Sequence, residues 1–295
     1  RDGIEGLNQG VDHPLAWCQN YDGCRSWYTT IGHGIPRYSD PVYLQHILGG
    51  IEWSAGAKQG DCSATKDNMF QKVPLVTEGL ADPFELAVAP DRRVFYIQRT
   101  GALKILDQRT LKISTALDFA YTPQMTSQSD GLLGVALDND FAQNNWVYLL
   151  YSDKVEKRQN VSRFTVVGDK VDMASEKRLL EIPTFRDEFR ANSHMGGSIQ
   201  FDKHGNLYIA TGDNTDPFNS DGYTPIDERP GRRALDAQGT AGNTNDFRGK
   251  ILRITPKPDG TYSIPPGNLF PPGTAQTKPE IYVMGMRNPF RITLD

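Results

Sequence analysis

The chain has 295 residues, with 32 lysines and arginines against 36 aspartates and glutamates, so its formal net charge is −4 at pH 7. This balance excludes a protein whose main task is to grip nucleic-acid phosphates, since such proteins carry a basic surplus. No apolar run approaches the roughly 18 residues that span a bilayer, which excludes a transmembrane helix. Hydrophobic residues make up 38% of the chain, enough for a core, while 28 glycines and 19 prolines indicate many turns and therefore many short strands.

Residues 1–57 begin with a loop-rich aromatic segment and continue into a helical pattern. Apolar residues recur at helical spacing after Asp40-Pro41, and a proline suits the first turn of a helix. We therefore predict a helix over residues 41–55. Its packed face is expected to consist of Leu44, Ile47, Leu48 and Ile51, which either pack within this segment or are covered by a part of the domain outside this sequence. The next segment, residues 58–72, is polar with few apolar anchors and is predicted to be a linker.

The first segment also carries histidines and aromatic residues that invite a functional interpretation. No histidine has a second potential ligand at a spacing known from metal sites, and His46 lies on the helical stripe, which favours packing. A catalytic or metal-binding role for a histidine is the less favoured alternative. The aromatic residues are expected to be core rather than a platform for sugar rings. The histidines are His13, His33 and His46, and the aromatic residues are Trp17, Tyr21, Trp27 and Tyr28.

The three cysteines, Cys18, Cys24 and Cys62, fit no known zinc pattern. Three thiols, or a single disulfide with no catalytic role, is the simplest interpretation. In an exported protein Cys62 is expected to pair with Cys18 or with Cys24, because disulfides persist in oxidising compartments. The sequence does not choose between these two partners.

From residue 73 onward the pattern changes to short alternating strands and turns. Each unit starts with a strand of small and apolar residues, continues through an aspartate and a turn, and adds a strand that carries tyrosine. The aspartates are Asp91, Asp138, Asp202 and Asp295. Such a repeat is typical of a β-propeller, whose four-stranded blades take roughly 40–50 residues each. The spacing widens along the chain, so we expect insertions in the later units, the largest over about residues 214–247.

A propeller needs about four to eight blades to close its ring. The sequence holds three such units and the start of a fourth, which we predict as a strand over Phe290–Leu294. Because an open ring would expose apolar blade faces, we expect the chain to be part of a longer protein. The predicted fold class is mostly β, with about three and a half propeller blades in residues 73–295.

Four motifs in this region, taken in order, resemble those of one family. They are Gly131–Asp138 (GLLGVALD), His194–Gly197 (HMGG) with Gly212-Asp213, Arg248–Arg253 (RGKILR) and Gly285–Pro289 (GMRNP). The region is similar to the soluble glucose/sorbosone dehydrogenases. This resemblance implies a six-bladed β-propeller that binds pyrroloquinoline quinone and calcium and oxidises sugars.

The first segment resembles the C-terminal end of a second family, the trehalose-utilisation or ThuA-like domains. The matching stretches are His13–Trp17, Gly23–Tyr28 with Gly32-His33, and His46–Trp53. That resemblance implies an α/β domain of which only the last part is present. Together the resemblances imply the end of a ThuA-like domain in residues 1–57, a linker at 58–72 and the N-terminal part of the propeller in residues 73–295, as in large secreted multi-domain bacterial proteins.

The dehydrogenase resemblance assigns catalytic roles to His194 and Asp213. Oxidation of a sugar hydroxyl requires a group that removes the hydroxyl proton, and a neutral imidazole suits that role near neutral pH. His194 precedes Gly196-Gly197, where missing side chains are expected to let a planar cofactor or a sugar approach closely. Asp213 is expected to orient the imidazole and to stabilise its charged form. The alternatives are a strand-entry histidine and a turn-forming aspartate.

Arg287, Asn288 and Gln128 are the predicted cofactor-binding residues. The guanidinium of Arg287 beside the amide of Asn288 suits the carboxylates and carbonyls of a tricarboxylic quinone, although an arginine before a turn also fits a plain surface position. The family's glucose enzymes carry glutamine at the position of Ser129, whereas this chain has Gln128 one residue earlier. Ser193 stands where those enzymes have an aspartate. No metal ligand is assigned here, since the resemblance implies calcium ligands beyond the last residue.

Two hypotheses from different classes follow. The first is a quinone-dependent oxidoreductase that oxidises an aldose or related sugar, with hydride transfer to pyrroloquinoline quinone and His194 as the general base. The second is a propeller that binds carbohydrate or protein without redox chemistry, which Ser129 and Ser193 keep open. The implied partners are a sugar, an electron acceptor and further domains of the same polypeptide, in a secreted or periplasmic setting, with no nucleic acid and no membrane span.

Overall fold

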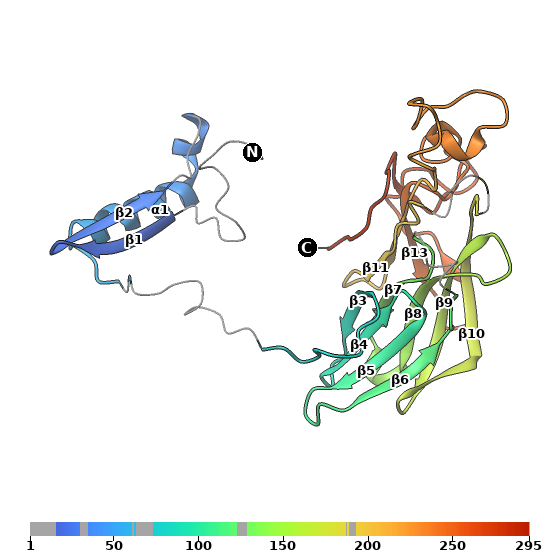
Figure 1. The fold of residues 1–295 in the computed structure, drawn as a ribbon, viewed down its shortest axis with the longest axis horizontal. Coiled ribbons are helices and arrows are strands. Elements are labelled where there is room, and N and C mark those ends of the chain that lie inside the picture. The colour runs from blue at the N-terminus through green and yellow to red at the C-terminus, as the bar shows by residue number, and fades with distance from the viewer. Residues whose placement is uncertain are drawn as a thin grey trace. The chain divides into compact units, whose positions relative to one another are not determined.

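The computed structural model divides the chain into two compact units, Arg1–Pro74 and Leu75–Asp295 (Figure 1). It describes residues 16–29, 35–60, 62, 73–122, 129–186, 188 and 193–294. Within these ranges, no helix is both long and apolar enough to cross a membrane. Each unit is described by itself below.

The first unit starts with an antiparallel hairpin, where the sequence predicted a loop. Strand β1 (Ala16–Tyr21) pairs with β2 (Cys24–Thr29), with Ala16 opposite Thr29. The two-residue connection, Asp22-Gly23, has φ angles of +51° and +78°. An Asp-Gly pair accepts such angles at both turn positions and thereby matches the twist of the flanking strands. This dipeptide is the signal that the sequence prediction overlooked.

A short 3-10 helix, η1 (Ile35–Ser39), leads into helix α1 (Pro41–Ser54), which confirms the predicted helix. The carboxylate of Asp40 caps α1 by accepting hydrogen bonds from the N–H groups of Val42 at 2.9 Å and Tyr43 at 3.4 Å. Pro41 lies in the first turn, where its missing N–H costs no helical hydrogen bond.

The predicted packing face of α1 is mostly exposed in this structure, so it is not the face that packs against the hairpin. The buried residues are Tyr43, Gly50 and Trp53, whereas Leu44, Leu48 and Ile51 are 45%, 53% and 56% exposed and Ile47 is half-buried. The physical reason is the close approach of Gly50 to Trp27 on β2. A Cβ atom at Gly50 would lie 2.3 Å from the Trp27 ring, so the absent side chain lets the helix pack against the hairpin on this face.

The aromatic residues of the hairpin divide between its two faces. Trp17 and Tyr28 stack with ring centroids 4.1 Å apart, yet both are exposed, so the expectation that they form core is wrong. Trp27 instead meets the His46 ring edge-on at 5.2 Å, and His46 Nε2 lies 3.2 Å from Thr29 Oγ1. His46 therefore has the packing role that was expected. His13, His33 and the Tyr21 side chain lie outside the described residues.

A disulfide joins Cys18 on β1 to Cys62, with Cα atoms 5.7 Å apart. This bond selects one of the two pairings that the sequence left open. Cys24 is an exposed free thiol. Of the predicted linker, residues 58–60 and 62 are described, and the others lie outside the described residues.

The second unit consists of three antiparallel sheets in which strands pair in chain order, except that β15 pairs with β13 (Figure 1). The first sheet contains β3 (Pro83–Val88), β4 (Arg93–Gln98), β5 (Ala102–Asp107) and β6 (Ile113–Asp118). The second contains β7 (Leu132–Leu137), β8 (Trp146–Ser152), β9 (Arg158–Val167) and β10 (Lys170–Pro183), with helix α3 (Phe141–Asn144) between β7 and β8. The third contains β11 (Ser198–Phe201), β12 (Leu207–Thr211), β13 (Lys250–Pro256), β14 (Tyr262–Ser263) and β15 (Ile281–Met284).

These sheets confirm the predicted mostly-β, blade-like architecture. Strand β7 lies against β3 on one side and β11 on the other, so the first strands of the three sheets are neighbours. Strands β14 and β15 pair with different parts of the same β13 edge and together take the fourth position of the third sheet. The insertion between β12 and β13 carries two short 3-10 helices, η2 (Arg233–Leu235) and η3 (Ala237–Gly239).

The predicted strand over Phe290–Leu294 is wrong in this structure. These residues pair with no described strand. Ile292 and Leu294 instead pack against the buried group formed by Tyr208, Ala210 and Ile251. Apolar alternation alone does not make a strand, because a strand also needs a neighbour that pairs with its backbone.

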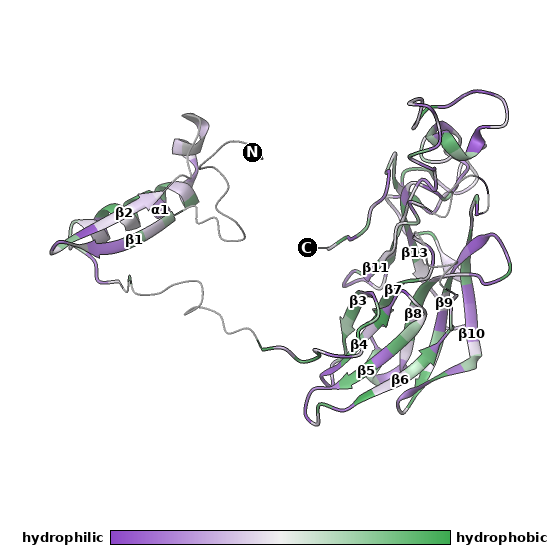
Figure 2. Cartoon of the chain, in the orientation of Figure 1, coloured by the Kyte–Doolittle hydropathy of each residue, from purple (hydrophilic) through white to green (hydrophobic). Residues whose placement is uncertain are grey.

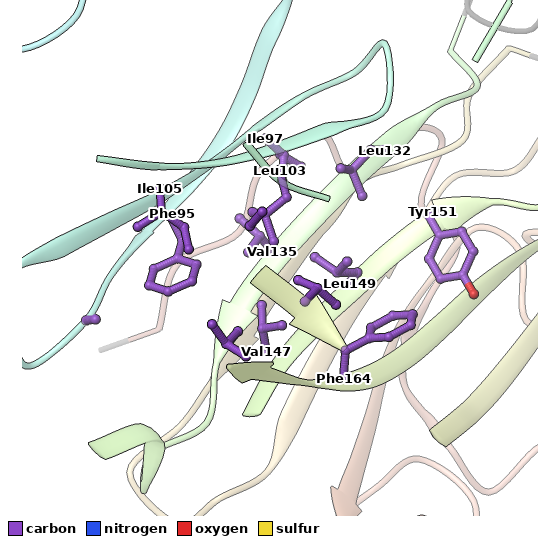
Figure 3. Close-up of a cluster of buried hydrophobic side chains, with 14 of the residues drawn as sticks. Phe95, Ile97, Leu103, Ile105, Leu132, Val135, Val147, Leu149, Tyr151 and Phe164 are labelled. Carbon is purple, nitrogen blue, oxygen red and sulfur yellow. The ribbon is translucent and has the colours of Figure 1, made fainter. Parts of the chain in front are cut away.

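The core lies in two layers between the three sheets, and β8 contributes to both. Val147 and Leu149 belong to the layer between the first and second sheets (Figure 3), while Tyr148 and Leu150 belong to the layer between the second and third. This division follows from the two-residue period of a strand. Figure 2 shows hydrophobic colour along many strands of this unit and hydrophilic colour on many of its loops. Burial of each large apolar side chain stabilises the fold by roughly 1.5–3 kcal/mol.

Glu85 on β3 connects the first strands of all three sheets. Its Oε2 accepts a hydrogen bond from the backbone N–H of Val135 on β7 at 3.0 Å, and its Oε1 accepts one from Ser198 Oγ on β11 at 2.6 Å. Burial raises the pKa of the Glu85 carboxyl above its ordinary value, against the lowering effect of these hydrogen bonds.

Replacing Glu85 with glutamine keeps both hydrogen bonds, because the amide oxygen accepts from Val135 and the amide nitrogen donates to the Ser198 hydroxyl. The pKa of Glu85 is higher in the folded state than its unfolded pKa of 4.5. Its contribution to the free energy of unfolding is therefore fully present below pH 4.5 and is lost as the pH rises through the folded-state pKa. We therefore expect the free energy of unfolding of Glu85→Gln, relative to the wild type, to increase from about pH 4 to about pH 8 in urea titrations.

The matched control is Glu78→Gln, because Glu78 is exposed. An equal trend with pH in this control, or no trend in Glu85→Gln, contradicts the assignment of the effect to the buried carboxyl.

Candidate functional site

The candidate site is built around residues 212–214, which directly follow β12. Three backbone hydrogen bonds reach this segment from distant parts of the chain. Gly249 N–H donates to Gly212 O at 2.7 Å, Asp213 N–H donates to Arg287 O at 2.8 Å, and Asn214 N–H donates to His194 O at 3.1 Å. The structure thus brings the backbone of Arg287 next to His194 and Asp213, which the sequence motifs had already paired.

His194 lies in the loop before β11, with its side chain almost fully buried and a left-handed φ of +47°. Its carbonyl oxygen passes directly over Gly212. A Cβ atom at Gly212 would lie 1.9 Å from His194 O, far inside van der Waals contact. Glycine at 212 is therefore a condition for the position of His194.

The imidazole of His194 faces a buried carboxylate. Its Nδ1 lies 2.9 Å from Asp213 Oδ1, and the same oxygen accepts hydrogen bonds from Thr215 N–H and Thr215 Oγ1, each at 2.9 Å. An ionised carboxylate only accepts, so Nδ1 carries the proton in the neutral ring and Nε2 keeps a lone pair. Nε2 has no hydrogen-bond partner among the described residues. The pair is thus arranged to take up a proton at Nε2.

Arg287 and Asn288 adjoin this pair but differ in what they contact. Arg287 is exposed, and within the described ranges its guanidinium makes no hydrogen bond or ion pair. Asn288 Oδ1 accepts a hydrogen bond from Gly196 N–H at 3.0 Å. Asn288 therefore ties the Arg287 segment to the His194 loop, which is an internal role that the sequence analysis did not assign.

The two glycines after His194 also differ from expectation. A Cβ atom at Gly196 would lie 2.5 Å from Ala210 O, and one at Gly197 would lie 2.8 Å from the Phe84 ring. These positions therefore lack side chains because the loop packs against β12 and against the first sheet. The sequence had led us to expect that these two positions are open to a ligand, and the structure shows instead that protein atoms fill the space beside them.

A buried lysine holds the end of the insertion beside the site. Lys250 Nζ donates to three backbone carbonyls, those of Thr240 at 2.8 Å, Ala241 at 3.1 Å and Arg248 at 2.7 Å. Burial lowers the pKa of Lys250 to about 8. The neighbouring Gly249 O accepts from Met286 N–H at 3.0 Å, so the lysine indirectly supports the strand end that carries Arg287.

Some predicted residues fall elsewhere. Gln128 lies outside the described residues, whereas Ser129 is half-buried and Ser193 is buried. Asn214, Thr215 and Lys250 were not predicted as site residues from the sequence. A usable signal existed for the first two, because polar residues directly after a buried strand are typical of a site.

No group of three or more His, Cys, Asp or Glu side chains within the described ranges is placed to hold a metal ion. The described residues therefore offer no such ligand set for the calcium that the resemblance implies. The unpaired guanidinium of Arg287 does fit an anionic organic ligand, because it presents a planar set of N–H donors to carboxylates.

Comparison with known proteins yields two family matches that lie in the predicted order. The glucose/sorbosone dehydrogenase family model matches residues 80–295. The trehalose-utilisation (ThuA) family model matches residues 2–54. Both resemblances drawn from the sequence motifs are confirmed.

Individual relatives include an enzyme and a protein of another kind. An aldose sugar dehydrogenase of Escherichia coli is 29% identical over 224 residues, covering 74% of this chain and 51% of that protein. The Hedgehog-interacting protein of Mus musculus is 26% identical over 240 residues, covering 75% of this chain and 31% of that protein. The chain spans about half the length of the bacterial relatives that it matches.

Solved structures agree on the fold. The structure of an oxidoreductase described as a glucose dehydrogenase from Thermus thermophilus superposes with a TM-score of 0.53 at 28% identity, covering 71% of this chain and 54% of that one. The apo form of the Escherichia coli aldose sugar dehydrogenase gives a TM-score of 0.50 at 24% identity, covering 71% and 52%. The family model matches well over half of the length of this chain, so the chain belongs to the glucose/sorbosone dehydrogenase family.

Proposed function

We propose that this chain carries part of a site that oxidises an aldose or a related sugar, with pyrroloquinoline quinone as the hydride acceptor and His194 as the general base. The observation that carries the proposal is the buried His194–Asp213 pair, whose Nε2 is left without a partner among the described residues. Family membership and the similarity to an aldose sugar dehydrogenase support the same reaction class.

The proposed step begins with the hydroxyl at the anomeric carbon of the sugar. Its O–H bond breaks as His194 Nε2 takes the proton, and a carbon–oxygen double bond forms while the hydrogen on the same carbon leaves with two electrons. Pyrroloquinoline quinone, when bound, supplies the acceptor for that hydride. The resulting imidazolium is stabilised by Asp213, which keeps its hydrogen bond to Nδ1 throughout.

Arg287 is the residue that we propose to hold the quinone. Its guanidinium is exposed and unpaired within the described ranges, and a tricarboxylic ligand suits charge-assisted bidentate contacts. Asn288 is proposed to assist by fixing this segment to the His194 loop through Gly196. Calcium, which the resemblance implies, enters no step here. A secreted or periplasmic setting is supported by the Cys18–Cys62 disulfide.

A second candidate is a propeller that binds carbohydrate or protein without oxidising it. The similarity to the Hedgehog-interacting protein favours it, since that relative is not named as an enzyme. The serines at positions 129 and 193 also favour this candidate, because the family's glucose enzymes have other residues at both positions.

Replacing His194 with alanine or glutamine should lower sugar turnover by the full-length protein about 10²- to 10⁴-fold, the usual contribution of a positioned general base. The protein is first reconstituted with pyrroloquinoline quinone and calcium, and turnover is measured with an artificial electron acceptor at saturating quinone. Quinone affinity should stay close to the wild-type value, because the imidazole moves a proton rather than anchoring the cofactor. His204→Gln is the control, since His204 is exposed in the turn after β11. Wild-type turnover in both His194 variants contradicts the assignment.

Arg287→Ala should give the opposite pattern, a weaker quinone affinity from the loss of a charge-assisted contact. A loss of about 10-fold or more corresponds to one such contact. Quinone is titrated by absorbance, with Arg109→Ala as the control because Arg109 is exposed and, among the residues that the structure describes, its side chain pairs with Asp107 in its own turn. If the calcium-loaded wild type binds no quinone, the dehydrogenase proposal fails and the non-catalytic candidate is favoured.

A further inference from the structure

We propose that Asn214 is a positioning residue for His194, because it holds the histidine backbone in the conformation from which the ring reaches Asp213. The inference rests on the proposed role of His194 as the base. Asn214 is not itself a catalytic residue in this proposal, since it contacts the His194 loop and not the reacting atoms.

Asn214 is buried and binds the His194 loop through both its backbone and its side chain. Its backbone N–H donates to His194 O at 3.1 Å, and its side-chain Nδ2 donates to Ser193 O at 3.2 Å. Two successive carbonyls of the loop are thus held by one residue. The side-chain Oδ1 accepts from Phe185 N–H at 2.5 Å, and Nδ2 also lies 3.2 Å from Met195 Sδ. Asn214 therefore joins the end of the second sheet to the entrance of the third.

The conformation that these bonds hold is an uncommon one. His194 has a φ of +47°, which lies in the left-handed region that residues other than glycine adopt only rarely. Such a conformation persists only where the surroundings over-determine it. Asn214 is itself left-handed, with a φ of +58°, and asparagine tolerates this region better than most residues with a side chain. Two left-handed residues therefore meet at the hydrogen bond from Asn214 N–H to His194 O.

The geometry links this backbone to the chemistry. The direction of the Cα–Cβ bond of His194 depends on its φ, so relaxation to an ordinary negative φ would turn the ring away from Asp213. Asp213 Oδ1 would remain bound to Thr215, so the carboxylate would stay in place while the imidazole moved. A misplacement of about 1 Å can cost about 10²-fold in rate. Loss of Asn214 should therefore affect turnover more than ligand affinity.

Three variants separate the contributions of Asn214. Asn214→Asp keeps the shape but cannot donate to Ser193 O. Asn214→Gly keeps the left-handed backbone and the bond to His194 O but removes the side chain. Asn214→Ala removes the side chain and the tolerance of a positive φ. The matched control is Asn145→Ala, because Asn145 has a φ of +54° in the turn between α3 and β8 and supplies the same backbone strain outside the site.

In the full-length protein with quinone and calcium, we expect Asn214→Ala and Asn214→Asp to lower kcat by about 10- to 100-fold. The KM for sugar and the quinone affinity should stay within about threefold of wild type, because Asn214 contacts neither ligand in this proposal. Asn214→Gly should lose less, and Asn145→Ala should keep the wild-type kcat. Wild-type kcat in both Asn214→Ala and Asn214→Asp overturns the proposal, as does an equal loss in Asn145→Ala.

A second measurement does not depend on turnover. In protein labelled with ¹⁵N-histidine, the hydrogen-bonded Nδ1–H of His194 is assigned by its disappearance in His194→Gln. We expect this resonance to be lost or strongly shifted in Asn214→Asp and unchanged in Asn145→Ala. An unchanged resonance in the folded Asn214 variants overturns the proposal even if turnover falls. If the wild type oxidises no sugar, this measurement still decides the positioning role, so failure of the proposed function and failure of the inference are distinguishable.

Discussion

The close approach of the His194 carbonyl to Gly212 is the constraint on which the rest of the site depends. A single carbon at position 212 would lie 1.9 Å from that oxygen, so the two segments meet only because one of them has no side chain. Once they meet, Asn214 N–H reaches His194 O and the carboxylate of Asp213 reaches Nδ1. The chemistry attributed to the pair is therefore a consequence of backbone packing between the ends of two strands.

The sheets supply this packing because their strands alternate between two cores. Strand β8 sends Val147 to one layer and Tyr148 to the other, so the second sheet is held on both faces. Because the sheets are rigid, the ends of their strands have fixed positions. The loops that join those ends carry the polar residues of the candidate site. Glu85 adds a polar link between the first strands of all three sheets through its hydrogen bonds to Val135 and Ser198.

The sequence predicted the sheets and the central pair because both depend on local patterns. Alternation with aspartate-containing turns indicates blades, and the motifs bring His194 and Asp213 to notice together. Features that depend on three-dimensional contact were missed. The face of α1 that packs against the hairpin was not predicted, because it depends on the close approach of Gly50 to Trp27. The roles of Asn214 and Lys250 rest on bonds to backbone carbonyls, which no pattern of side chains records.

Those backbone bonds also explain how a long insertion can lie beside a precise site. Lys250 donates hydrogen bonds to the backbone carbonyls of Thr240, Ala241 and Arg248. Every residue type has a backbone carbonyl. These hydrogen bonds therefore do not depend on which side chains stand at positions 240 and 241. A loop held in this way can change much of its sequence without moving Gly249 or the Arg287 segment that Gly249 supports through Met286. We therefore expect substitutions at 240 and 241 that preserve the backbone to leave the Arg287 segment in place.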